Sequence, residues 1–307
     1  MFFRPTGPAA ESLHALKRKP GLKRLKFAVR GKGNCDKLII GIGQVHPVLT
    51  GKFARFQARR IANVQAEIYE ACNALYDFAH VTTFGMEGYS GKRKARFPKA
   101  FLLQMQMASG RRREVKSVLR GVANRWRKAL NRGNENDTGT YASMLNALTV
   151  MQALHADVSM YPIEQADVHG AIGVAITQLQ QEIAKIETSA AYRSCQKKGG
   201  KGLTQAEYEA AKTRNALVKQ FNATLKHPER DRAILREVLK HADSPVTVFV
   251  LGTGHRSGML SLTAKHLPDG YLFAWASPPS FWWKKAMLYR VGWVCIALMM
   301  LVLWLNT

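Results

Sequence analysis

The chain has 307 residues, of which 47% are hydrophobic, so it is long enough and apolar enough to bury a sizeable core. These proportions exclude an intrinsically disordered chain. Lys and Arg outnumber Asp and Glu by 46 to 21, and the resulting formal charge of +25 favours polyanionic partners such as nucleic acid or an anionic lipid surface.

The amino-terminal part begins with a basic segment and continues into a strand and a long helix. Proline and glycine interrupt residues 1–36, which predicts a mostly irregular basic arm. Residues 37–43 (KLIIGIG) predict a short buried strand that ends on Gly43, and His46 lies in the turn that follows. The next segment, residues 52–80, repeats apolar side chains at helical spacing and therefore predicts a long helix.

A second strand and a basic insert come next. Residues 81–91 (VTTFGMEGYSG) predict a strand that ends in a glycine turn carrying Glu87. Residues 92–132 are strongly basic and predict a loop followed by a helix from about 99 to 131, which makes this segment a basic helical insert. Residues 131–140 are polar and predict a connection to the next helix.

The middle of the chain is expected to be mainly helical. Apolar periodicity predicts helices at residues 141–155, 165–190 and 204–226. Between the first two of these helices, residues 157–164 predict a third strand that ends on the acid Glu164. Its proline cannot donate to a ladder, which indicates the edge of a sheet or the end of a strand.

The remainder of the folded part repeats a helix followed by a strand. A compact helix is predicted at residues 227–242, and the apolar run at 246–252 (VTVFVLG) predicts a strand that ends on Gly252. His255 then introduces a further helix, and residues 271–276 form another apolar segment.

This alternation predicts an α/β domain over residues 37–278, with a mixed, largely parallel central sheet flanked by long helices. In open parallel sheets, functional groups collect at the carboxyl ends of the strands. Any catalytic or binding side chains are therefore expected at that edge.

The last predicted element is a transmembrane helix. Residues 286–305 (AMLYRVGWVCIALMMLVLWL) are apolar except for Arg290, and about 20 helical residues span the hydrocarbon core of a bilayer. Apolar side chains cover every face, which favours a membrane span over the alternative of a buried core helix. Because Lys284 and Lys285 precede the run, the positive-inside rule predicts a single-pass anchor at 282–305 with the main domain in the cytoplasm.

Two segments share one local pattern, in which an apolar strand is followed by GxxH. They supply Gly43 with His46 and Gly252 with His255. Glycine permits a tight exit from the strand, and the histidine three residues later is expected at the rim of the sheet, accessible from a cleft. Glu87 follows the strand predicted within residues 81–91 in the same way. Two imidazoles and a carboxylate suit zinc, manganese or cobalt, and they equally suit a general base with its orienting partners.

These segments resemble the family of TraB, PrgY, GumN and Tiki proteins, within the fold group that includes erythromycin esterase-like and ChaN-like proteins. The resemblance is carried by GIGQVH, GMEGYS and HPERDRAIL followed by VTVFVLGTGHRSGM. The family signature is two GxxH motifs, an intervening glutamate, and an ER pair followed by Asn or Asp ahead of the second motif. On this resemblance, the metal or catalytic set is Gly43, His46, Glu87, Gly252 and His255. The motif ahead of the last strand is Glu229, Arg230 and Asp231.

The resemblance also implies an activity. Tiki members are metal-dependent proteases with a C-terminal membrane anchor, and TraB and PrgY members shut down peptide pheromones. The expected function is therefore that of a membrane-anchored hydrolase that acts on peptides and depends on a divalent metal, namely Mn, Co or Zn. The alternative is a non-catalytic, membrane-tethered protein that sequesters a peptide.

Three further features have open interpretations. Glu164 is either a contact beside the site or a helix-capping acid. Arg230 either clamps a carboxylate or phosphate of a substrate in a bidentate fork or pairs with a neighbour on the surface of its helix. The basic stretches around Trp126 allow a nucleic-acid-binding membrane adaptor, but apposition to an anionic lipid surface is the preferred explanation because no nucleic-acid recognition motif accompanies them.

Overall fold

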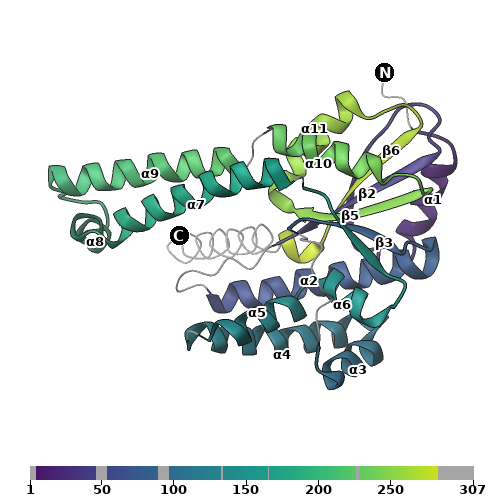
Figure 1. The fold of residues 1–307 in the computed structure, drawn as a ribbon, viewed down its shortest axis with the longest axis horizontal. Helices are drawn as coiled ribbons and strands as arrows, with labels where there is room; N and C mark the ends of the chain where they lie inside the picture. The colour runs from purple at the N-terminus through teal and green to yellow at the C-terminus, as the bar shows by residue number, and fades with distance from the viewer. Residues whose placement is uncertain are drawn as a thin grey trace, which may run out of the picture.

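The computed structural model describes residues 5–45, 54–88, 97–132, 134–164, 166–225 and 228–282. These residues form a central six-stranded sheet with helices on both faces (Figure 1). The prediction of an α/β fold with a largely parallel sheet and long helices is confirmed.

The sheet places the carboxyl ends of five strands at one edge. Its strands are β1 (Lys26–Arg30), β2 (Lys37–Gln44), β3 (Thr83–Met86), β4 (Ser159–Pro162), β5 (Val246–Gly252) and β6 (Tyr271–Ser277). Their order is β1-β6-β2-β5-β3-β4. Strand β1 runs antiparallel to β6, and the other described pairs are parallel, so β6, β2, β5, β3 and β4 all end at the same edge. The strand that carries a proline, β4, is an edge strand, as predicted.

Within the described residues, eleven α-helices cover the sheet or extend from it. They are α1 (Pro8–Lys17), α2 (Ala54–Ala79), α3 (Lys99–Ala108), α4 (Arg112–Asn131), α5 (Glu135–Met144), α6 (Ala147–Leu154), α7 (Ala166–Thr188), α8 (Ala190–Lys197), α9 (Gln205–Leu225), α10 (Pro228–Lys240) and α11 (Arg256–His266). Two short 3-10 helices, η1 (Thr253–His255) and η2 (Pro279–Trp282), follow β5 and β6. Helices α7 and α9 lie side by side as a hairpin with α8 at its tip, and this hairpin projects from the sheet (Figure 1).

Alternate side chains of the strands divide the core into two layers. Leu38, Ile40 and Ile42 of β2 pack in the larger layer with α2 and α4, whereas Ile39 faces the smaller layer with α10 and α11. All four are fully buried. Burial of such a side chain contributes about 1.5–3 kcal/mol, so the period-two pattern of β2 fixes both its register and its position in the middle of the sheet.

The predicted basic arm, residues 1–36, contains a helix and a strand that the sequence did not predict. Ala9, Leu13 and Leu16 recur at helical spacing on α1 and are buried against the larger core layer. Strand β1 pairs with β6 and thereby adds an antiparallel strand to the sheet. Pro8 occupies the first turn of α1, where proline is tolerated, so the prolines and glycines bound these elements and do not prevent them.

The basic insert also differs from its prediction in two places. The single helix predicted over 99–131 is divided into α3 and α4, and Gly110 adopts a left-handed φ of 75° between them. The polar connection predicted over 131–140 is largely helix α5. Asn134 caps this helix, because its side chain accepts a hydrogen bond of 3.1 Å from the backbone N–H of Asp137.

Helix α4 is amphipathic and turns its aromatic residue inwards. Its buried residues are Val115, Leu119, Val122, Ala123, Trp126 and Ala129. Trp126 is 2% exposed and belongs to the larger core layer. It therefore cannot stack on nucleic-acid bases, which removes the aromatic contact that favoured the nucleic-acid interpretation.

No helix within the described residues is long and apolar enough to cross a membrane. The predicted transmembrane segment, residues 286–305, lies outside those residues, so the anchor stays a prediction. The described chain leads towards it from η2, where the backbone N–H and the hydroxyl of Ser280 donate to Glu67 of α2 at 2.9 and 2.7 Å.

Candidate active site

Five of the predicted side chains meet at the carboxyl edge of the sheet. They are Glu87 after β3, Glu164 after β4, Arg230 and Asp231 in the first turn of α10, and His255 in η1 after β5. Each of these side chains is at most 10% exposed. The parallel topology brings the three strand ends together, and α10 packs its first turn against them.

His255 and Asp231 form the buried centre of this cluster. Nδ1 of His255 donates a hydrogen bond to Oδ1 of Asp231. Because a carboxylate only accepts hydrogen bonds, Nδ1 is the protonated ring nitrogen, and in the neutral ring Nε2 carries the lone pair. Asp231 thus fixes both the tautomer and the orientation of the imidazole.

The lone pair of His255 faces Glu87. Nε2 lies 3.7 Å from Oε1 of Glu87, which is too long for a direct hydrogen bond. Two ligands of one tetrahedral metal, with bonds of about 2.1 Å, lie roughly 3.4 Å apart, so this separation suits a shared metal ion or a shared water molecule. Nε2 of His255 and Oε1 of Glu87 are therefore placed to act on the same metal ion or water molecule.

Arg230 holds the two glutamates in place. Its Nη2 donates to Oε1 of Glu87 at 2.9 Å, and its Nε donates to Oε1 of Glu164 at 2.7 Å. The other oxygen of Glu87 accepts the backbone N–H of Gly252 at 2.6 Å. The predicted role of Arg230 as a surface partner on its helix is wrong, because its side chain is buried and bonds to carboxylates that follow two strands; a contact with substrate stays a prediction. Glu164 is accordingly a partner of this cluster.

The glycines of the two GxxH segments have different roles. A Cβ at Gly43 would lie 2.8 Å from Cγ2 of Thr253 and 3.3 Å from Nε1 of Trp275, so close packing requires glycine there. Gly252 has a φ of −52°, which any residue can adopt, so the tight exit predicted for it does not depend on glycine. His255 lies at the rim, as predicted, and is 5% exposed; its access from a cleft stays a prediction.

His46, the third member of the predicted set, lies outside the described residues, and its role as a ligand stays a prediction. Among the residues that the structure describes, no group of three or more His, Cys, Asp and Glu side chains is arranged to hold a metal ion. His255 and Glu87 provide two suitable donors within that part of the chain. A metal site here therefore requires a further ligand, for which His46 is the candidate.

Gly258 is a supporting residue that has no predicted role. It lies in the first turn of α11, where a Cβ would come within 1.7 Å of Oδ2 of Asp231. The absence of a side chain is what admits the Asp231 carboxylate beside His255. The only signal of this role in the sequence is the presence of a glycine inside a predicted helix.

Substitution of Gly258 by alanine is expected to push the Asp231 carboxylate away from His255. The hydrolytic rate should then fall about as far as it does in Asp231→Asn, on the order of a thousandfold, because both changes leave the imidazole without its orienting partner. Gly254→Ala is the matched control, since no described atom lies within 4 Å of that Cβ position. Equal rates for the two variants would show that the pairing of Asp231 with His255 is dispensable.

No family model, no curated protein and no solved structure matches this chain. The resemblance to the TraB and Tiki family accordingly stays a prediction that depends on its motifs. The geometry of the site is independent of that resemblance.

Proposed function

We propose that this chain is a hydrolase that cleaves peptide bonds at the site formed by His255 and Glu87. The observation that carries the proposal is the buried line from Asp231 through His255 to Glu87, in which an oriented imidazole presents its lone pair to a fixed carboxylate. A histidine aligned by a carboxylate is a common arrangement for proton transfer and for metal ligation.

The residues of the chain provide the following steps. Nε2 of His255 accepts a proton from a water molecule that hydrogen-bonds to Oε1 of Glu87, and that water attacks the peptide carbonyl carbon. The Asp231 carboxylate stabilises the imidazolium that forms. Nε2 then returns the proton to the nitrogen of the leaving amine. Arg230 and the backbone N–H of Gly252 keep the Glu87 carboxylate in place during these steps.

The predicted metal fits part of this site. Nε2 of His255 and Oε1 of Glu87 are the described donors that would hold it, and the hydrogen bond from Nδ1 to Asp231 is the usual support of a metal-binding histidine. With a metal in place Nε2 would be a ligand and would not accept the proton, so the steps above describe the site without a metal. When bound, a divalent ion such as Mn, Co or Zn would polarise the peptide carbonyl and bring the pKa of a bound water towards neutrality.

We also infer that residues 282–305 anchor the protein in a membrane, with the main domain on the cytoplasmic side. The support is the apolar composition of residues 286–305 and the preceding lysines. The protein should stay in the membrane fraction after an alkaline carbonate wash, and a chain that ends at residue 282 should not. Release of both chains would contradict the anchor.

Incubation of the full-length protein with a mixture of synthetic peptides, read by mass spectrometry, tests the activity. New peptide termini should appear. Their loss after treatment with a chelator and their return with Mn, Co or Zn would assign Nε2 of His255 as a metal ligand, whereas their persistence would assign it as the proton acceptor. Peptides that are retained by the protein but stay intact would instead support the sequestering alternative. If peptides are neither cleaved nor retained, the proposal is wrong.

A further inference from the structure

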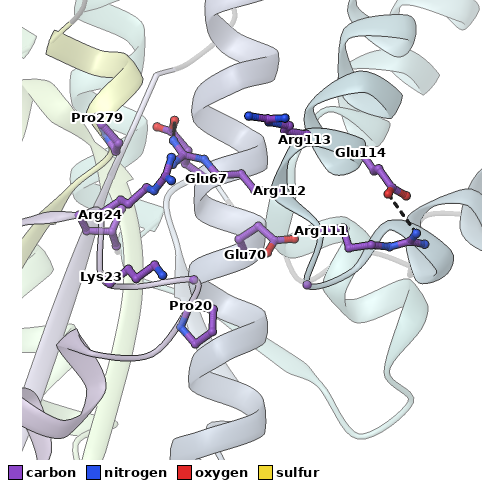
Figure 2. A pocket seen from close by; sticks show the side chains of 13 residues that line it. Pro20, Lys23, Arg24, Glu67, Glu70, Arg111, Arg112, Arg113, Glu114 and Pro279 are labelled. Atoms are coloured by element: carbon purple, nitrogen blue, oxygen red, sulfur yellow. Dashed lines mark hydrogen bonds and ion pairs between the residues drawn. The ribbon is translucent and has the colours of Figure 1, made fainter.

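A polar pocket lies away from the candidate active site. It has a volume of about 440 Å³ and is formed by the turn after α1, the middle of α2, the start of α4 and Pro279 (Figure 2). None of the active-site residues described above lines it. The role of its lining residues therefore requires a separate explanation.

The lining carries a surplus of positive charge. The cationic residues are Lys23, Arg24, Arg111, Arg112 and Arg113. Two of the three lining acids are already neutralised, because Glu67 pairs with Arg112 and Lys116, and Glu114 pairs with Arg111. Lys23, Arg24 and Arg113 form no ion pair with another described residue. Figure 2 shows the side chains of Arg24, Arg112 and Arg113 reaching in from both sides towards Glu67.

The third acid, Glu70, is a buried carboxyl with unused hydrogen-bonding capacity. It is 7% exposed, and its Oε1 has no hydrogen-bond partner among the described residues. Burial raises the pKa of Glu70 to about 7, against the smaller opposing effects of the backbone N–H of Gly110 and the charge of Arg112. At pH 7 about half of these side chains are therefore protonated, and a protonated carboxyl can donate a hydrogen bond.

We propose that this pocket binds the phosphate group of a small phosphorylated ligand, with Lys23, Arg24 and Arg113 as the cationic partners and Glu70 as a hydrogen-bond donor. Charge-assisted hydrogen bonds from lysine and arginine are the usual means of phosphate recognition. Helix α4 begins at this pocket without a side-chain cap on its first N–H groups, which adds a further favourable potential for an anion. The volume exceeds that of phosphate alone and leaves room for a small organic group.

A cationic ligand is disfavoured because it would meet three unpaired positive charges for one carboxyl. Glu70→Gln separates the two possibilities, because glutamine keeps a hydrogen-bond donor and carries no charge. A phosphate ligand should bind this variant at least as tightly as the wild type. Weaker binding of phosphate by Glu70→Gln than by the wild type would overturn the proposal.

Calorimetric titration of the full-length protein with inorganic phosphate at pH 7 tests the site directly. We expect one saturable site, and the Lys23→Ala, Arg24→Ala double variant should bind about tenfold more weakly or worse, because two charge-assisted contacts are lost. Lys197→Ala, Lys201→Ala removes the same charge from exposed positions around α8 and should change the affinity by less than about twofold. Absence of a saturable site, or equal weakening in both double variants, would overturn the proposal.

Vesicles distinguish a free phosphate compound from a lipid headgroup. The measured quantity is the difference in binding between phosphatidylcholine vesicles with and without phosphatidic acid. If the loss of Lys23 and Arg24 abolishes this difference, the phosphate belongs to a lipid. If the double variant preserves the difference but weakens the binding of inorganic phosphate, the natural ligand is a free phosphorylated compound.

Discussion

Replacement of Asp231 by asparagine is expected to lower the rate of peptide hydrolysis by about a thousandfold, and His255→Ala is expected to lower it further. Asparagine keeps the shape of Asp231 but presents a neutral amide to Nδ1. The imidazole is then no longer held in the tautomer that leaves Nε2 unprotonated, and the imidazolium loses its stabilising charge. The effect should appear in kcat more than in KM, because the pair acts on the transition state.

The measurement is the initial rate on a cleaved peptide identified from the mixture, for variants whose unfolding curves match the wild type. His266→Ala is the control, since that histidine is exposed at the end of α11. It should leave the rate unchanged within about twofold. An Asp231→Asn variant as active as His266→Ala would remove His255 from the reaction.

The largest effect on stability is expected from Arg230→Met. Its guanidinium is 9% exposed and is shared by Glu87 and Glu164, which are equally buried. Removal of the cation leaves two buried carboxylates facing each other across an apolar side chain, and the loss of one partner of a buried ion pair typically costs about 3–5 kcal/mol. We expect the free energy of unfolding at pH 7 to fall by about 3 kcal/mol or more.

Urea denaturation at neutral pH measures this change. Arg232→Met provides the matched control, because Arg232 lies in the same helix but forms an exposed pair with Glu229. The control should lose less than about 1 kcal/mol. Addition of Glu164→Gln to Arg230→Met should recover part of the loss, since one buried charge is removed. Similar unfolding curves for the two single variants would show that the Arg230 network does not stabilise the fold.

The strands and most of the helices could be predicted because their apolar periodicity is strong. The run at residues 37–43 and the one at 246–252 have little alternation, as expected of strands buried on both faces. Helix α1 is missed from the sequence because it is short, has only three buried residues, and is bounded by prolines and glycines that suggest an irregular segment. The division between α3 and α4 depends on Gly110, and a single glycine does not change the apolar periodicity from which the helix was predicted.

The sequence predicts which residues belong to the candidate site, but it does not predict which of them contact one another. A parallel sheet brings strand ends together, which is why Glu87 and His255 were expected at one edge. The partner of His255 depends on how α10 packs across the sheet, and no local pattern in the sequence encodes that packing. The same holds for Arg230, whose two carboxylates follow different strands. Burial of His255 likewise results from tertiary packing.

The central claim is that His255 and Glu87 act together on one species. A double-mutant cycle on the hydrolytic rate, with Glu87→Gln, His255→Gln and the double variant, tests it most directly. If the two side chains share a water molecule or a metal ion, each single variant should lose most of the activity and the double variant should lose hardly more than either one. Losses that multiply in the double variant, or a single variant with wild-type activity, would contradict the account.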